Sequence, residues 1–350
     1  MVMVWAGRAN WANASARAKA RKAALIDATR MKQLLQQDVE AISASIGEFG
    51  YRTELDTYAA RMDGTDLVEA ALSHNMDRSL NEVLAFCNGD LRDMVAIYVE
   101  RFAYANAKTV LRAIHSGADA EKVAQNVLPE ENENNARWNR IVENADTLAD
   151  AVAQMRGPWA RALRGLEPEA SLQEMEDALD RHYYQAAVDA VGPTGAEGVL
   201  RRYLRTEIDH RNVINLLRAL RQNLDAEVRE ALVLKGGQAL TGDLLRQAVA
   251  AADDAALLDV LRRAPSFNDA GLEEAMATSR ESGSLDPVVN ALTGHRYAVL
   301  KRMSHLHPIS ALPVIHYIER KVLEVQNLRL LVRGKAAGLD LEVIEAHLWM

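Results

Sequence analysis

The chain is poor in the residues that stabilise disulfide-bonded, strand-rich or membrane-spanning proteins. It has one cysteine, Cys87, in 350 residues, which excludes an internal disulfide and fits a reducing compartment, and we expect this lone thiol to be buried. Aromatic residues make up only 5%, and runs of Val, Ile and Thr are missing, which disfavours strands. No apolar run approaches the roughly 18–20 residues that span a bilayer. The net charge of -8 argues against general nucleic-acid binding.

Motifs that mark catalytic or cofactor sites are also missing. The sequence contains no G-x-x-x-x-G-K-[ST], no G-x-G-x-x-G and no H-E-x-x-H. Lys235-Gly236-Gly237 is rich in glycine, but no strand pattern precedes it, so we interpret it as a turn between helices. The sequence therefore predicts no catalytic residue, no cofactor, no metal ligand and no small-molecule substrate.

What the chain does contain is one pattern written three times. It reads N-A-K-T-V-L-R-A from Asn106, N-V-I-N-L-L-R-A from Asn212 and N-L-R-L-L-V-R-G from Asn327, at intervals of 106 and 115 residues. Each Asn is followed by an Arg after six residues, a Gly or Asn after eleven, an Asp after thirteen and a Glu after fifteen. Ala, Leu, Glu, Arg and Gln are abundant, so the sequence predicts an all-α chain of three related units.

The spacing within the pattern predicts a helix, a stop, a tight turn and a second helix. A Gly or Asn stands where the first helix would end, and these residues enter the left-handed conformation at the lowest cost. The Asp that follows two residues later can accept hydrogen bonds from the free amides of the next helix. The predicted structural caps are Gly117 with Asp119, Asn223 with Asp225, and Gly338 with Asp340.

Breaks along the chain place the three units at residues 1–130, 131–264 and 265–350. The first begins with a long amphipathic helical segment, expected from Asn13 to about Gly47, whose first half is basic. Three interpretations of this half remain open. It could be a mitochondrial-type transit segment, a basic face turned toward an anionic partner or lipid surface, or a solvated helix face.

The arginines of the pattern, Arg112, Arg218 and Arg333, have two interpretations. Three repeats around a pseudo-symmetry axis would place equivalent side chains around it, where they could line a polar cavity that grips a partner. Alternatively, each Arg pairs with an acid of a neighbouring helix in the same stretches, with Glu100, Glu207 and Glu324 as candidates. We expect ion pairs for the individual side chains and a socket for the molecule as a whole.

The third copy resembles a known family. The stretch from Tyr317 to Lys335 is similar to the closing signature of the C subunit of archaeal-type ATP synthases, a family that includes the d subunit of vacuolar ATPases. The stretch from Glu207 to Arg218, the later Gly236-Gly237 and the segment from Ala16 to Lys22 are similar too, so the resemblance covers nearly the whole chain. Val322 departs from the pattern, because the family often carries an acid there.

The resemblance implies a fold and a function. Members are all-helical funnels of three units around a pseudo-threefold axis, at the cytoplasmic face of the membrane. They bind the central-shaft subunits, D and F, and the rotor ring of proteolipid subunits, transmit torque, and hold no nucleotide and no metal. It also implies a non-catalytic chain. From their equivalent positions in the three copies, we take Arg112, Arg218 and Arg333 as the candidate contacts with the shaft. The alternative is a helical-repeat scaffold outside a rotary ATPase. The coupled ion, H⁺ or Na⁺, stays open.

Overall fold

The computed structural model describes residues 8–120, 123, 133–167 and 169–349, and all regular elements in them are helices. These residues contain no β-strand, so the predicted all-α fold class is confirmed. Two compact units are present: Met1–Glu176 with Pro313–Met350, and Asp177–Leu312. The boundary that the sequence sets at residue 130 lies outside the described residues, and the division into three units stays a prediction.

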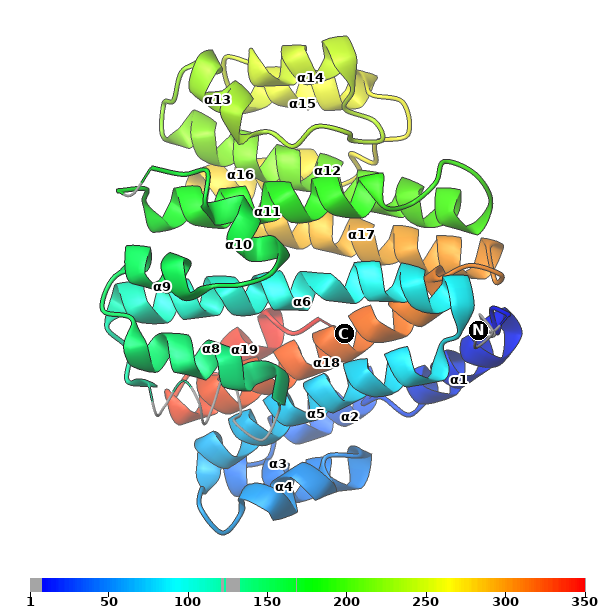
Figure 1. Ribbon diagram of the computed structural model, residues 1–350, viewed down its shortest axis with the longest axis vertical. Helices are drawn as coiled ribbons and strands as arrows, with labels where there is room; N and C mark the ends of the chain where they lie inside the picture. The colour runs from blue at the N-terminus through cyan, green and yellow to red at the C-terminus, as the bar shows by residue number, and fades with distance from the viewer. Residues whose placement is uncertain (1–7, 121–122, 124–132, 168, 350) are drawn as a thin grey trace, which may run out of the picture. The chain divides into compact units, whose positions relative to one another are not determined.

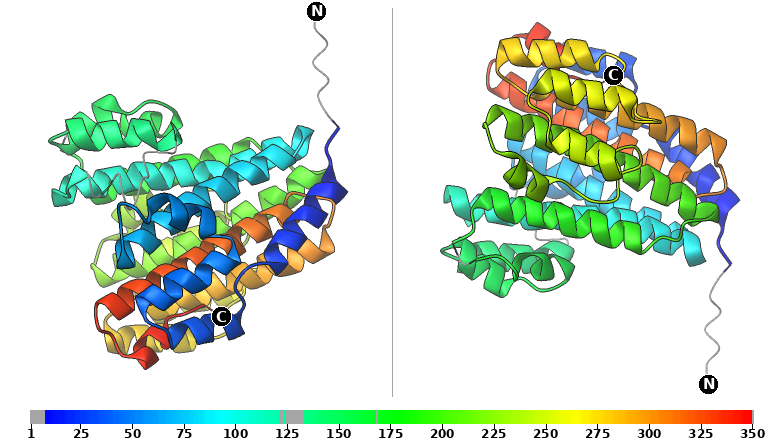
Figure 2. Two further views of the ribbon diagram at one scale, coloured as in Figure 1. Left: turned by 90° about the horizontal axis from the view of Figure 1, so that it is seen from below. Right: turned by 90° about the horizontal axis from the view of Figure 1, so that it is seen from above.

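Three long helices run through the first unit, α5, α6 and α18, and shorter helices pack on them (Figure 1). Helices α8 and α9 lie along α6, as the view from below in Figure 2 shows. The elements are α1 (Trp11–Ala23), α2 (Ala28–Leu35), α3 (Val39–Ile46), the 3-10 turn η1 (Gly47–Phe49), α4 (Arg52–Tyr58), α5 (Gly64–Phe86), α6 (Gly89–Ser116), α8 (Glu133–Asn144), α9 (Leu148–Gln154), α10 (Pro158–Leu163), α18 (Leu312–Ala336) and α19 (Leu341–Ala346).

The N-terminal segment is three helices, not the single long helix that the sequence predicted. Asp27 accepts a hydrogen bond from the Arg30 amide, and Asp38 accepts one from the Ala41 amide, both at 2.8 Å. Each carboxylate caps the start of a new helix, α2 or α3, so the chain turns twice within the predicted segment. The apolar faces of α2 and α3 pack with α5, α18 and α19 in one core that joins both ends of the chain, from Ile26 to Leu348.

Part of the basic face of the N-terminal segment contacts the chain itself. Arg17 lies 4.7 Å from the centre of the Phe86 ring, and Arg21 pairs with Glu82. Lys32 lies 3.1 Å from Glu345 of α19. These contacts place Arg17, Arg21 and Lys32 against other residues of the same unit.

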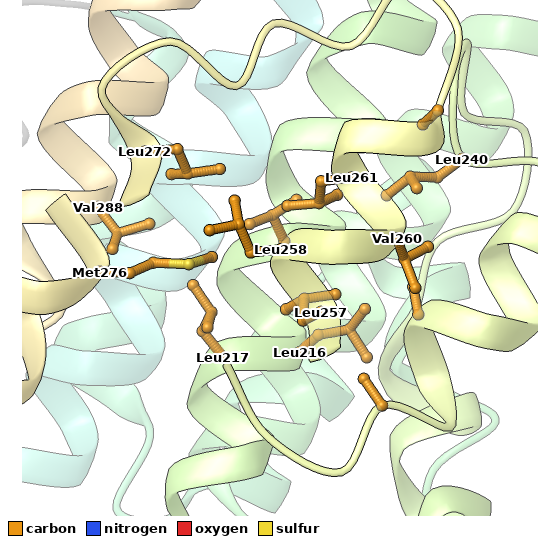
Figure 3. Close-up of a cluster of buried hydrophobic side chains, with 14 of the residues drawn as sticks. Leu216, Leu217, Leu240, Leu257, Leu258, Val260, Leu261, Leu272, Met276 and Val288 are labelled. Atoms are coloured by element: carbon orange, nitrogen blue, oxygen red, sulfur yellow. The ribbon is translucent and has the colours of Figure 1, made fainter. Parts of the chain in front are cut away.

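The second unit is built from α12 (Gly195–Arg221), α13 (Ala226–Leu232), α14 (Gly242–Val249), α15 (Asp254–Arg263), α16 (Leu272–Ser282) and α17 (Asp286–Leu306). Helix α11 (Leu172–Asp189) begins in the first unit and continues into the second. Leucines of α15 point toward Leu216 and Leu217 of α12, with Met276 of α16 and Val288 of α17 closing the same core (Figure 3). Burying these side chains stabilises the unit, because each contributes roughly 1.5–3 kcal/mol when removed from water.

Cys87 is a buried free thiol, as expected, and burial raises its pKa to about 11. Within the part of the chain that the structure describes, no helix combines the length and the apolar character that crossing a membrane requires.

Candidate functional site

The three copies of the sequence pattern end their first helix in the same way. Gly117, Asn223 and Gly338 all have positive φ, at 64°, 53° and 70°. In each copy the amide of the next residue donates to the carbonyl five residues back, and the amide of the left-handed residue donates to the carbonyl three residues back. The longer bonds are Ala118 to Ala113, Leu224 to Ala219 and Leu339 to Gly334, at 2.9, 3.0 and 2.9 Å. This pair of bonds defines a Schellman stop.

The aspartates after the stops differ from one another. Asp225 caps α13, because its carboxylate accepts a 2.9 Å hydrogen bond from the Val228 amide. Asp340 precedes α19, but its side chain makes no cap hydrogen bond with that helix. At Asp119 the main-chain carbonyl accepts the Val123 amide at 3.1 Å. Glu121 and most of the segment that follows Asp119 lie outside the described residues.

The asparagine that opens each copy has a role that the sequence pattern did not predict. The Asn212 side chain accepts the Leu234 amide at 2.7 Å and donates to the Leu234 carbonyl at 2.9 Å. Asn327 makes the same pair of bonds to Trp349, at 3.0 and 2.6 Å, again with the residue 22 positions later. Both asparagines are buried and fix the segment that leaves the second helix of their copy. The position 22 residues after Asn106 lies outside the described residues.

Two of the three repeat arginines form ion pairs between copies. Arg112 of α6 donates to both carboxylate oxygens of Glu176 on α11, at 2.6 and 2.7 Å. Arg333 of α18 donates to both oxygens of Glu69 on α5, the Nη2–Oε2 distance being 3.0 Å. Arg218 is half-buried near the end of α12, and no side-chain hydrogen bond or ion pair engages it within the described residues.

The acids suggested as partners by the sequence are the wrong ones. Glu100, Glu207 and Glu324 precede their arginines by nine to twelve residues on the same helices. That separation corresponds to roughly 13–18 Å along a helix axis, too far for an ion pair. Instead, Glu207 lies 3.2 Å from Arg296. Glu324 accepts from the Ile26 amide at 2.6 Å, from the Tyr51 hydroxyl at 2.7 Å and from Lys321 at 2.8 Å.

The glycine-rich turn surrounds a carboxylate of the chain itself. It lies between α13 and α14, as predicted. The amides of Gln238, Ala239 and Leu240 donate to the Asp209 side chain at 2.9, 2.7 and 3.0 Å. A Cβ on Gly237 would lie 2.1 Å from Asp209 Oδ1, so only glycine allows this approach. The amides that could have cradled a phosphate are thus already used.

The described residues hold no group of three or more His, Cys, Asp or Glu side chains arranged to bind a metal ion. All three copies share a Schellman stop and an arginine near the end of the long helix, and the second and third copies add the pair of asparagine hydrogen bonds described above, which we call the asparagine clamp. The three arginines, which the sequence analysis gave as candidate partner contacts, are the candidate site residues.

Comparison with known proteins gives one consistent result. The family model described as ATP synthase (C/AC39) subunit matches residues 14–347. A protein of Haloferax volcanii is 28% identical over 338 residues, covering 95% of both chains. One from Halobacterium salinarum is 29% identical over 353 residues, covering 98% of this chain and 99% of its own. One from Methanosarcina acetivorans is 26% identical over 345 residues, covering 98% and 93%. All three carry the name of the C subunit of A-type ATP synthase.

Proposed function

Because the chain belongs to the ATP synthase (C/AC39) subunit family, we propose that it is the central-stalk subunit of a rotary A-type ATP synthase. It is a non-catalytic subunit of the A/V-type complex. In this proposal it forms a socket at the cytoplasmic face of the membrane. The socket receives the central-shaft subunits, D and F, and rests on the proteolipid rotor ring. Torque then passes through it between ATP synthesis or hydrolysis and ion translocation.

The socket is supported by which copies the ion pairs connect. Arg112 of the first copy binds Glu176, which stands before the second copy's motif, and Arg333 of the third copy binds Glu69 of the first. Helix α12, which carries the second copy's Arg218, packs against α17, which leads into the third. In a linear stack of repeats, the last copy would not bind the first. The contact between the third and first copies, which lies within the unit Met1–Glu176 with Pro313–Met350, therefore supports a socket over a linear scaffold.

Arg112 and Arg333 keep much of their surface despite these ion pairs. Their side chains are 60% and 63% exposed. Together with Arg218, these side chains are the proposed contacts with the shaft.

A reconstitution tests the proposal. The purified chain is mixed with the D–F heterodimer and with the rotor ring in nanodiscs, and the complexes are separated by size. We expect the ring and the D–F heterodimer to elute together only when the chain is present. Elution of the chain apart from both would overturn the proposal. Small-angle scattering of the free chain adds a second readout, since a solenoid scaffold is elongated and a closed socket is compact.

A further inference from the structure

Two of the three repeat arginines pair with an acid on a neighbouring helix, and the third copy of that acid is missing from the sequence. The helices that carry Glu69 and Glu176 can be aligned with α17 on an Ala-Leu pair, of which the leucine is buried in all three: Leu72, Leu179 and Leu292. Two residues before this alanine stands Glu69 in α5 and Glu176 in α11. The equivalent residue of α17 is Val289. The third helix therefore has an apolar side chain where the other two have the acid that binds an arginine.

Val289, which stands in place of the acid, lies on α17, the helix that α12 packs against. Leu217 of α12 shares a core with Val288 and Leu292 of α17 (Figure 3 labels the first two). Arg218 follows Leu217 directly, at the same place in the pattern as Arg112 and Arg333. It is half-buried and has no carboxylate within hydrogen-bonding distance among the described residues. Partial burial of a guanidinium is unfavourable without a paired anion, and the charge stays available for one.

We propose that a carboxylate of the partner completes this position: an Asp or Glu side chain of the central shaft binds Arg218 as Glu69 and Glu176 bind Arg333 and Arg112. This inference rests on the proposed function. It makes Arg218 the principal electrostatic contact of the three arginines, since the other two are already neutralised by the chain's own acids. A planar guanidinium recognises a carboxylate through two parallel hydrogen bonds, so the contact also fixes orientation.

The test measures the dissociation constant of the D–F heterodimer for the full-length chain by calorimetry. Arg218→Gln should weaken binding at least about tenfold, because a hydrogen-bonded charge pair is lost, and Arg218→Glu should weaken it further. Arg202→Gln, at an exposed position of the same helix, is the matched control and should leave binding unchanged. Equal affinities of wild type and Arg218→Gln would overturn the inference.

A second variant acts without removing the arginine. Val289→Glu restores the acid of the other two copies, so Arg218 would pair within the chain and partner affinity should fall several-fold, while Val289→Gln should have a smaller effect. Unchanged affinity of Val289→Glu would count against the inference.

Failure of the proposed function and failure of the Arg218 contact give different results. If the wild-type chain does not bind D–F at all, the proposed function fails, whereas binding that ignores Arg218 contradicts only this inference. Restored affinity between Arg218→Glu and a shaft variant with one acid changed to Lys would identify the carboxylate.

Discussion

Arg333 and Glu69 are separated by 264 residues in the chain and are joined by two hydrogen bonds, with a Nη2–Oε2 distance of 3.0 Å. Arg329, one helical turn before Arg333, also approaches the same carboxylate, its Nε lying 3.3 Å from Oε2. Glu69 is 4% exposed, so one buried acid serves two guanidinium groups of α18. The last long helix is thereby fixed to the first unit's α5 by charge as well as by apolar packing.

Neutralising this acid should destabilise the fold. Glu69→Gln leaves the half-buried Arg329 and the more exposed Arg333 without their anion, and we expect the free energy of unfolding to fall by about 1–3 kcal/mol. Urea titration measures the change. The control is Asp243→Asn, which breaks an ion pair with Arg246 whose side chains are 72% and 80% exposed, and it should cause no measurable change. Equal, negligible effects of both substitutions would show that Glu69 contributes no stability.

The turn around Asp209 should not tolerate any side chain at Gly237. Gly237→Ala places a Cβ 2.1 Å from Oδ1 and 3.0 Å from the Leu240 carbonyl, so the carboxylate or the turn must move and break the amide hydrogen bonds. We expect a loss of about 2 kcal/mol or more, because buried polar groups lose their partners. Gly165→Ala, at a position with no heavy atom within 4 Å and without positive φ, is the control. If Gly237→Ala unfolded at the same temperature as the wild type, the close approach of Gly237 to Asp209 would not be what stabilises the turn.

The Schellman stop at Gly338 allows backbone strain to be measured alone. Its φ is 70°, and a Cβ there would meet nothing within 4 Å. Gly338→Val should therefore cost about 1–2 kcal/mol from the left-handed backbone alone. Gly338→Asn should recover much of this loss, since Asn223 adopts φ 53° at the same place in the second copy. If Val and Asn at this position gave the same stability in chemical denaturation, strain would not be the cause.

His210 should make stability depend on pH. Burial is the main reason that the pKa of His210 is lowered from 6.5 to about 4, and nearby His295 lowers the pKa further, against the effect of Glu207. The unfolded chain therefore binds a proton at a higher pH than the folded chain. Stability is fully present above pH 6.5 and is lost as pH falls toward 4, by at most about 3 kcal/mol for this group.

The comparison with His210→Phe isolates this effect. Phe keeps an aromatic ring beside Phe267, which meets the His210 ring edge to face at a centroid distance of 6.0 Å. Unfolding free energies measured from pH 7 to 4 should fall more steeply for the wild type. Asp209, whose pKa burial raises to about 6, titrates in both proteins and cancels in the difference. Parallel curves would mean that His210 takes up its proton equally in both states.

The helical fold and the repeated stops could be predicted because their causes are local. The helices end at Gly117, Asn223 and Gly338 because these residues adopt the left-handed backbone conformation easily. Each stands eleven residues after the asparagine that opens its copy, so the repeated pattern locates all three. The N-terminal breaks at Asp27 and Asp38 carried the same kind of signal, since both acids are good N-cap residues. The apolar stripe that continues across them concealed the two turns.

The ion-pair partners could not be read from one sequence. Arg112 and Glu176 are 64 residues apart, and only packing between helices of different copies brings them together. The asparagine clamp depends on how the chain returns 22 residues after Asn212 and Asn327, which no local preference specifies. Once the acids are known, however, their absence at Val289 is visible in the sequence. Comparison between repeats then indicates Arg218 as the arginine that we propose to bind a partner.

We propose that this chain links the shaft to the rotor ring of an ATP synthase. The most direct measurement is purification of the tagged chain from gently solubilised native membranes, with the accompanying chains identified by mass. We expect the catalytic subunits, the shaft subunits D and F and a small proteolipid to be recovered together with it. Recovery of soluble, unrelated partners alone would contradict the account and favour a helical-repeat scaffold outside the rotary ATPase.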